Sequence, residues 1–357
     1  QVKDKHKEEV KKILEDAGIG YVKLGKPTEE RHILVEKGDA TYQFGIDYLR
    51  DVWYSTSYLL DRKQSMNGCA KKRFENYKKQ PLEFVFDKSF TGKLSQFGLN
   101  PDRRTPTGIK AAIIREKGTN GEREMAYMLY LAGFDVKDVT MTDLVSGRET
   151  LEDINFIVFC GGFSNSDVLG SAKGWAGAFL FNPKAKAALD NFYARKDTLS
   201  LGVCNGCQLM IELNLINPDF TKKAKMLHND SHKFESKFVG VTIPMNRSVM
   251  FGSLSGSKLG IWVAHGEGKF SLPYHEDKYN VVLKYSYDEY PGNPNGSDYS
   301  VAGLASPDGR HLAMMPHLER SCFPWQNAYY PADRIKNDQI TPWIEAFVNA
   351  RRWVEEK

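Results

Sequence analysis

The pattern of apolar positions changes from helical to extended near the start of the chain. From Lys5 to Ala17 apolar residues recur at helical spacing, which predicts a helix that Gly18 and Gly20 end. Short apolar runs between turn residues then predict three strands, at residues 21–24, 32–35 and 41–44. We therefore expect residues 1–51 to form a small α+β unit.

Residues 52–107 lose this periodicity and gather basic residues, as in Lys71-Lys72-Arg73. The segment ends in the turn-rich run Asn100-Pro101-Asp102. Such a composition is typical of a connection between folded units. We interpret the segment as a partly helical linker.

From about residue 108, short and fully apolar runs alternate with amphipathic helical patterns. The first pair is a strand at Ala111–Ile114 and a helix at Glu122–Ala132 that Gly133 closes. Further strands are expected at residues 136–141, 156–160 and 199–203, and further helices at residues 185–193 and 343–353. This alternation predicts an α/β fold with a doubly wound, mostly parallel sheet. Between residues 237 and 312 the runs follow one another without helices, which predicts added antiparallel strands.

Composition narrows the class of protein. At 357 residues the chain exceeds the roughly 100 to 200 residues of one domain, and 41% apolar with 26% charged residues is ordinary for a soluble globular protein. A net charge of +4 without a dense basic stripe argues against nucleic acid as a partner. No apolar run approaches the ~20 residues of a membrane span. Five cysteines, an odd number, indicate thiol chemistry in a reducing cytoplasm.

Cys204 stands where a predicted strand meets a predicted helix. The strand ends at Val203, Cys204-Asn205-Gly206 forms a sharp turn, and a helix is expected at residues 207–213. Gly202 and Gly206 bracket the cysteine as G-x-C-x-G, the counterpart of the G-x-S-x-G elbow that exposes a nucleophile. The helix N-terminus favours the thiolate over the thiol, and the Asn205 backbone N–H can bind an oxyanion. We predict that Cys204 is a nucleophile.

Two further motifs can supply its partners. Gly161 and Gly162 follow a buried strand and can bring a second oxyanion donor close to a substrate, although a plain tight turn also explains the pair. His317 and Glu319 lie at i and i+2, on one side of an extended backbone. Glu319 can then orient the imidazole that takes the thiol proton, although the pair alone could be a surface coincidence.

Two other interpretations of these cysteines were considered. Cys204 and Cys207 form a C-x-x-C at a helix start, as in a thiol oxidoreductase, but a redox pair explains neither the glycine loop nor the His-Glu pair. A zinc site could combine the two cysteines with His228 and His232, but the intervening stretch is too long and too helical for an ordinary finger. We therefore predict no metal site.

Five motifs occur in a fixed order along the second half of the chain. They are Gly161-Gly162-Phe163-Ser164 with Asp167-Val168-Leu169-Gly170, Gly202-Val203-Cys204-Asn205-Gly206-Cys207-Gln208, Ala264-His265-Gly266-Glu267-Gly268, Asn293-Pro294-Asn295-Gly296-Ser297, and Met315-Pro316-His317 with Glu319-Arg320. In this order they resemble the glutaminase domain of the phosphoribosylformylglycinamidine synthase family, a class I glutamine amidotransferase with a flavodoxin-like fold. The resemblance covers residues 108–357.

This resemblance implies roles for named residues. The catalytic triad would be Cys204, His317 and Glu319. The residues implied or inferred to bind substrate are Gly162, Phe163, Asn205, Gln208, His265 and Glu267. The chain departs from the family pattern at Leu318, where the family usually has proline, and at Asn165-Ser166, where an aromatic-glycine pair is common.

The N-terminal residues 1–51 resemble the end of the synthetase portion in the long, single-chain form of this family, notably at Ile19-Gly20, Gly25-Lys26 and Thr28-Glu29-Glu30-Arg31. The chain opens at Gln1 without an initiator methionine, so we expect a fragment whose upstream synthetase domains are its partners. The resemblance implies that ATP and magnesium serve that upstream part, and no cofactor is expected in this chain.

The expected function is hydrolysis of glutamine to glutamate and ammonia. By the resemblance, the ammonia serves the ATP-dependent conversion of formylglycinamide ribonucleotide to formylglycinamidine ribonucleotide in purine biosynthesis. Two alternatives stay open. One is a fragment that has no catalytic activity without the synthetase domains, and the other is a related cysteine hydrolase with a similar elbow.

Overall fold

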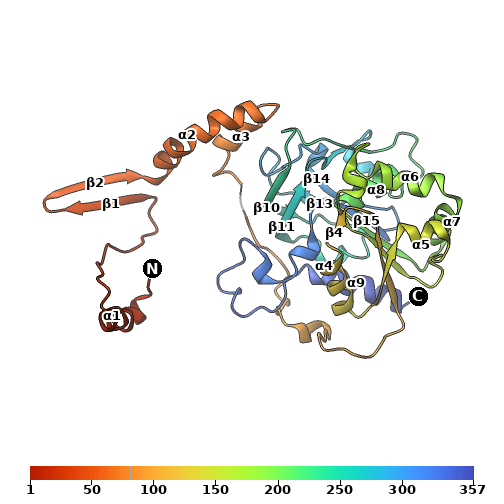
Figure 1. Ribbon diagram of the computed structural model, residues 1–357, viewed down its shortest axis with the longest axis horizontal. Helices are drawn as coiled ribbons and strands as arrows, with labels where there is room; N and C mark the ends of the chain where they lie inside the picture. The colour runs from red at the N-terminus through yellow and green to blue at the C-terminus, as the bar shows by residue number, and fades with distance from the viewer. Residues whose placement is uncertain (81) are drawn as a thin grey trace. The chain divides into compact units, whose positions relative to one another are not determined.

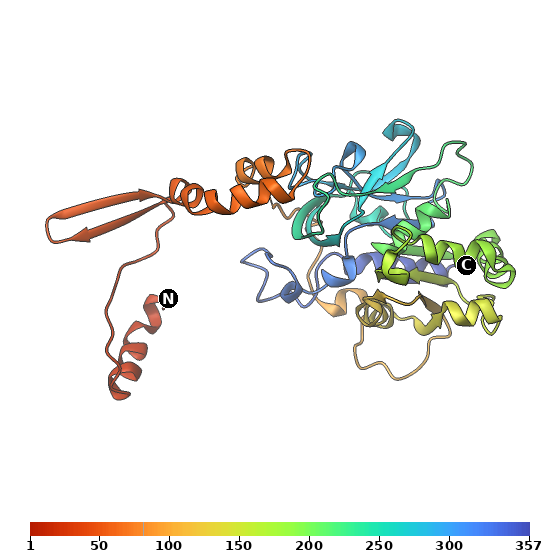
Figure 2. The same ribbon diagram turned by 45° about the horizontal axis from the view of Figure 1, so that its top comes forward.

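The computed structural model describes residues 1–80 and 82–357, which divide into two compact units, Gln1–Thr56 and Ser57–Lys357 (Figure 1). The first unit contains the helix α1 (Lys7–Asp16), close to its predicted bounds. It also contains the strands β1 (His32–Lys37) and β2 (Ala40–Gly45), which pair antiparallel as the flat orange-red ribbon in Figure 2. The helix α2 (Ile46–Gln64) follows β2 directly, and none of residues 1–56 is buried.

The prediction of a strand at Tyr21–Leu24 is wrong, because these residues adopt no regular structure. A strand needs partners for its backbone N–H and C=O groups, and β1 and β2 pair only with each other. Leu24 is 96% exposed, so this apolar run does not mark burial.

Part of the segment interpreted as a linker packs within the second unit. The helix α3 (Cys69–Glu75) and the 3-10 turn at Leu94–Phe97 lie in it. Val85 exchanges two backbone hydrogen bonds with Lys258, at 2.7 and 2.8 Å. Phe90 is buried in the main hydrophobic core. The second unit therefore includes residues well before residue 108.

A nine-stranded sheet organises the second unit, in the order β11-β10-β13-β14-β15-β8-β6-β3-β5. The parallel strands are β3 (Lys110–Arg115), β5 (Asp135–Thr140), β6 (Phe156–Phe159), β8 (Leu199–Val203) and β15 (His311–Met314). The antiparallel part consists of β10 (Glu235–Thr242), β11 (Lys258–His265), β13 (Asn280–Tyr285) and β14 (Val301–Ala305). It joins the parallel part where β14 pairs with β15. The predicted α/β class, with a parallel sheet and added antiparallel strands, is confirmed.

Helices pack around this sheet in two groups. One group is α4 (Glu122–Ala132) against α9 (Ile344–Glu355) (Figure 1). The other group is α5 (Met141–Ser146), α6 (Lys173–Phe181), α7 (Pro183–Ala194) and α8 (Asn205–Glu212). The helix α4 has its predicted bounds, whereas α8 begins at Asn205 instead of Cys207. Within the described residues, no helix combines the length and the apolar character needed to cross a bilayer.

Two short strand pairs lie beside the sheet. The strand β4 (Thr119–Asn120) pairs with β7 (Gly161–Gly162), and β9 (Lys225–Leu227) pairs with β12 (Lys269–Ser271). The pair β4–β7 matters for the site because it ties the paired glycines to the loop before α4.

The carboxyl ends of four strands converge on one edge of the sheet. The parallel neighbours β6, β8 and β15 end at Phe159, Val203 and Met314. The strand β11 runs in the same direction through successive antiparallel pairings and ends at His265. Ligands of α/β proteins bind at this kind of edge. The segments after β6, β8 and β15 therefore start side by side, and a bridge between Trp262 and His317 joins β11 to the segment after β15.

Gly206 lets α8 approach β6, and its replacement tests this packing. A Cβ atom there would lie 2.0 Å from the carbonyl oxygen of Phe159, which is backbone and cannot rotate away. We expect Gly206→Ala to lower the free energy of unfolding by more than the ~1–3 kcal/mol of ordinary overpacking. Gly252→Ala, where no atom lies within 4 Å, is the matched control. Equal stability of both variants in urea denaturation would contradict this account.

Candidate active site

Cys204 occupies a strained position between β8 and α8. Its backbone has φ 53° and ψ −106°, a conformation that a residue with a side chain adopts only when its surroundings enforce it. Gly202 allows α8 to lie close to β8 at this turn, since a Cβ atom at Gly202 would lie 2.5 Å from the carbonyl oxygen of Gly206. The cysteine is 5% exposed and lines a small cavity. Strain of this kind concentrates at functional sites.

His317 lies between Cys204 and Glu319. Its Nδ1 atom is 2.7 Å from Oε1 of Glu319, and its ring lies close to Cys204, whose thiol donates to the Ala264 carbonyl at 3.6 Å. Its backbone N–H donates to the carbonyl of Trp262 on β11, at 2.9 Å. Gly161 leaves room for the His317 ring beside Cys204, because a Cβ atom at Gly161 would lie 2.9 Å from that ring and 3.3 Å from the Cβ of Cys204. The structure thus brings the three residues of the predicted triad together.

The predicted backbone between His317 and Glu319 is wrong in one respect. We expected both residues on one extended segment, but Leu318–Arg320 forms a 3-10 turn. His317 alone is extended, and Glu319 reaches its imidazole from within the turn. Leu318, which stands at the usual proline position, is fully buried and anchors the turn in the core.

Burial and the neighbouring charge shift the pKa of His317 in opposite directions. Burial alone would lower the pKa of its imidazole, but the charge of Glu319 and hydrogen bonds to Cys204 and Glu319 raise that pKa to about 9. Glu319 is 2% exposed, and its Oε2 atom has no hydrogen-bond partner among the described residues. Arg320 lies nearby, with Nε 3.6 Å from Oε1 of Glu319. The site therefore favours a protonated imidazole braced by a carboxylate.

Of the two predicted oxyanion donors, Asn205 follows the cysteine directly and Gly162 lines the same cavity as the cysteine. Asn205 is the first residue of α8, so its backbone N–H has no acceptor within the helix. Gly162 has φ +118°, and a Cβ atom there would lie 2.6 Å from Thr119 Cα. Glycine at 162 is therefore needed for the close approach of β7 to β4. We expected it for the approach to a substrate, and the structure adds this second reason.

A cavity of about 110 Å³ lies beside Cys204. This volume exceeds the ~10–15 Å³ that one water needs, so a small molecule fits. The residues that line it are Gly162, Phe163, Asp167, Ser171, Cys204, Gln208, Ala264, His265, Gly266 and Glu267. Five of the six residues predicted to bind substrate are among them. The exception is Asn205, whose side chain is buried and binds neighbouring loops.

The Asn205 side chain joins α8 to the loop after β7. Its Oδ1 accepts the backbone N–H of Ser164 at 3.1 Å, and its Nδ2 donates to Gln208 at 2.9 Å and to Asp167 at 3.3 Å. The amide of Gln208 in turn donates to the Glu267 carbonyl at 2.7 Å. Gln208 therefore holds the loops that border the cavity as well as lining it.

His265 closes the cavity from the end of β11. Burial, and then the charge of His317, lower the pKa of its imidazole to about 3, so the ring is neutral at physiological pH. Both ring nitrogens are buried and have no hydrogen-bond partner in the described part of the chain. Asn229 holds this loop by accepting from Gly268 N–H at 3.0 Å and donating to the His265 carbonyl at 2.7 Å.

Three residues of the site were not singled out from the sequence. Asp167 and Ser171 line the cavity, and Asn229 supports the loop after β11. Asp167 belongs to one of the five motifs, which was the available signal. Asn229 lies in a polar stretch without periodicity, so only the tertiary structure reveals it.

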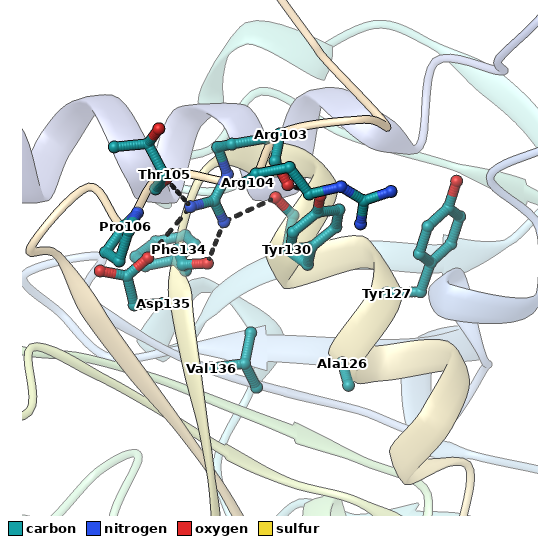
Figure 3. Close-up of a pocket in the computed structure, with 10 residues that line it drawn as sticks. All are labelled: Arg103, Arg104, Thr105, Pro106, Ala126, Tyr127, Tyr130, Phe134, Asp135 and Val136. Atoms are coloured by element: carbon teal, nitrogen blue, oxygen red, sulfur yellow. Dashed lines mark hydrogen bonds and ion pairs between the residues drawn. The ribbon is translucent and has the colours of Figure 1, made fainter.

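A larger hollow of about 480 Å³ lies beside α4 (Figure 3). Arg103 borders it and donates to Asp135 at 3.0 Å and to the Phe134 carbonyl at 2.7 Å. No predicted site residue lines this hollow. It therefore belongs to the packing of the segment before β3 and not to the candidate site.

The zinc interpretation finds no support among the described residues, because no group of three or more His, Cys, Asp or Glu side chains is placed to hold a metal. All five cysteines are free, including Cys204 and Cys207. Cys207 is fully buried in the core, and burial raises the pKa of its thiol.

Comparisons with known proteins show the family of this chain. Residues 108–354 match the family of CobB/CobQ-like glutamine amidotransferase domains. The chain is 40% identical to a probable phosphoribosylformylglycinamidine synthase, chloroplastic/mitochondrial, of Arabidopsis thaliana, over 86% of this chain and 23% of that protein. It is 38% identical to the phosphoribosylformylglycinamidine synthase of Homo sapiens, over 98% of this chain and 28% of that protein.

A solved structure gives the same class of fold. PurLQS from Thermotoga maritima superposes with a TM-score of 0.51 at 26% identity, covering 70% of this chain and 98% of the other. Fold, family match and site together define a glutamine amidotransferase. The chain belongs to the phosphoribosylformylglycinamidine synthase family of enzymes, as their glutamine amidotransferase domain. It spans about a quarter of the length of these relatives.

The raised pKa of His317 predicts a pH dependence. Its folded pKa of about 9 lies above the ordinary value of ~6.5, so its contribution to stability is complete below pH ~6.5 and is lost as pH rises through about 9. NMR titration of histidine side chains should show a midpoint near 9. Glu319→Gln removes the charge that opposes burial, so the midpoint should fall.

Glu276→Gln is the control for this titration, because Glu276 pairs with Lys284 outside the cavity. Its His317 midpoint should stay at the wild-type value. A midpoint that Glu319→Gln leaves unchanged would contradict the electrostatic account.

Proposed function

We propose that this chain hydrolyses glutamine to glutamate and ammonia, with Cys204 as nucleophile, His317 as proton carrier and Glu319 as the carboxylate that orients it. The observation that carries the proposal is the position of His317, hydrogen-bonded to Glu319 and close to Cys204, beside a small cavity that Cys204 lines. The membership of the chain in a glutamine amidotransferase family supports the choice of substrate.

The first half of the reaction forms a thioester. The Cys204 thiolate attacks the amide carbon of glutamine, and the carbonyl electrons move to the oxygen. Backbone N–H groups of Asn205 and Gly162 bind this oxyanion. The amide nitrogen takes a proton from His317, the C–N bond breaks, and ammonia leaves.

The second half releases glutamate. His317, now neutral, takes a proton from water while the water oxygen attacks the thioester carbon. The C–S bond then breaks and restores the thiolate beside a protonated imidazole. Glu319 keeps Nδ1 of His317 engaged throughout, so the other nitrogen stays directed at the reacting atoms.

The whole enzyme would use this ammonia elsewhere. Because the chain matches about a quarter of phosphoribosylformylglycinamidine synthases, we propose that a synthetase portion receives the ammonia. There, ATP with magnesium would activate formylglycinamide ribonucleotide, which becomes formylglycinamidine ribonucleotide in purine biosynthesis. The upstream synthetase domains are thus the proposed partners, and the cytoplasm stays the predicted location.

Replacement of the nucleophile tests the proposal directly. Cys204→Ala should lower glutamate release from glutamine by at least ~10³-fold, because the variant lacks the sulfur that forms the thioester. Cys207→Ala, three residues along α8 in the core, should keep most of the activity. The measurement is enzymatic detection of glutamate. Comparable loss in both variants would count against Cys204.

The two alternatives predict different outcomes for Glu319→Gln. In the proposed triad this variant loses ~10²-fold or more of the glutaminase rate, since the imidazole loses its orienting charge. In a related cysteine hydrolase that does not use Glu319, the rate would hardly change. A chain that is silent alone but active with the upstream synthetase portion would identify the fragment alternative.

A further inference from the structure

The corner between α2 and α3, residues 61–73, contains a carboxylate that is almost fully buried. Asp61 is 7% exposed, and its carboxylate accepts hydrogen bonds from Ser65 at 2.7 Å, from Lys233 at 3.0 Å and from Arg73. Burial alone would raise the pKa of the Asp61 carboxyl, but these hydrogen bonds and the charge of Arg73 lower that pKa below its ordinary value. Asp61 is therefore ionised, and the loss of a cationic partner would leave a buried charge less well balanced.

The contact with Lys233 joins this corner to a distant part of the chain. Lys233 belongs to the polar turn at residues 229–233, just before β10. The backbone N–H of Met66 donates to the Ser231 carbonyl at 3.0 Å, and the Asn67 side chain donates to the Asp230 carbonyl at 2.8 Å. The corner therefore holds the turn by an ion pair and by hydrogen bonds to its backbone.

The same turn holds the loop after β11, residues 265–268, which borders the cavity beside Cys204. The Asn229 amide donates to the Lys233 carbonyl at 2.9 Å within the turn and to the His265 carbonyl at 2.7 Å in the loop. Its Oδ1 atom accepts from the Gly268 N–H at 3.0 Å. Because Asn229 is fully buried, water does not replace these hydrogen bonds. The position of the loop therefore depends on the position of the turn.

We propose that Asp61 and Lys233 are positioning residues, whose ion pair fixes the turn and, through Asn229, the loop that carries His265 and Glu267 beside Cys204. This inference rests on the proposed function, because that loop borders the cavity in which glutamine would bind. It gives residues 61–73 a part in the site, although they lie before the family match at residues 108–354.

The triad comes from segments that this series of contacts does not include. Cys204 follows β8, and His317 and Glu319 follow β15. Loss of the ion pair should therefore loosen the loop and weaken the binding of glutamine, while the chemical step changes less. A merely stabilising ion pair would lower the free energy of unfolding and leave the binding of glutamine to the folded chain unchanged.

Hydrogen exchange measured by mass spectrometry on the 357-residue chain tests the link between corner and loop. In Asp61→Asn, peptides that cover residues 265–268 should exchange roughly 2- to 30-fold faster, the range expected for a residue of such a network. Lys233→Met is a milder change, because Arg73 still balances Asp61, and it should act in the same direction. Peptides that cover β6 and β8 should keep their wild-type rates.

Steady-state kinetics of glutamate release test the consequence for the reaction. In both variants the KM for glutamine should rise by a factor in the same range, whereas kcat should change less than about twofold. The double variant Asp61→Asn with Lys233→Met should show no larger rise in KM than Asp61→Asn alone, since both act through one ion pair. Asp61→Glu keeps the charge and should restore part of the wild-type KM.

Glu83→Gln is the matched control, because Glu83 also joins the segment before β3 to another part of the unit by an ion pair. Its carboxylate lies 2.6 Å from Nζ of Lys258, at the opposite end of β11 from His265. Exchange at residues 265–268 and the KM for glutamine should both stay at their wild-type values in this variant.

The possible outcomes separate this inference from the proposed function. Unchanged exchange at residues 265–268 in both variants overturns the inference, and so does faster exchange with an unchanged KM. Exchange that rises equally throughout the chain shows a purely stabilising ion pair and also overturns it. If the wild type releases no glutamate, either alone or with the synthetase portion, the proposed function fails, whereas the exchange rates still decide whether the ion pair positions the loop.

Discussion

The hydrogen bonds between the parallel strands β6, β8 and β15 determine where the candidate site forms. Each strand ends at the same edge of the sheet, and each is followed at once by a segment of the site. The loop after β6 brings Gly161, the elbow after β8 brings Cys204, and the segment after β15 brings His317. Glycines at 161, 202 and 206 then allow contacts that any side chain would block. A change in strand register would move these residues apart, so the site depends on the packing of the core.

Burial sets the charge states of the two histidines in the site. His317 and Glu319 are both almost fully enclosed, so the carboxylate acts on the imidazole with little screening by water. His265 lies nearby without a carboxylate partner, and burial keeps it neutral. Two buried histidines therefore take opposite charge states, because only the ring of His317 is hydrogen-bonded to a carboxylate. This difference separates a proton carrier from a neutral hydrogen-bonding group.

Much of this arrangement was predictable from the sequence, for reasons that differ between elements. The helix at Glu122–Ala132 has a clear apolar stripe and a terminal glycine, so its bounds were predicted correctly. The helix α6 was missed because its sequence, KGWAGAFLF, is apolar on almost every side and shows no helical period. The start of α8 was placed too late because only Cys204 is left-handed, whereas Asn205 is already helical. The left-handed run at Asn165–Asp167 contains no glycine, so no sequence pattern indicated this backbone conformation, although Asp167 lies in one of the five motifs.

In the proposed mechanism, Cys204 and the braced imidazole of His317 act together on an amide. Acid quenching of the chain during reaction with glutamine, followed by peptide mass spectrometry, tests it most directly. The account predicts one glutamyl group attached to the Cys204 peptide, and none in a His317→Asn variant, which cannot protonate the leaving amine. Glutamine turnover with the adduct on a different cysteine, or with no adduct formed on any residue, would contradict it.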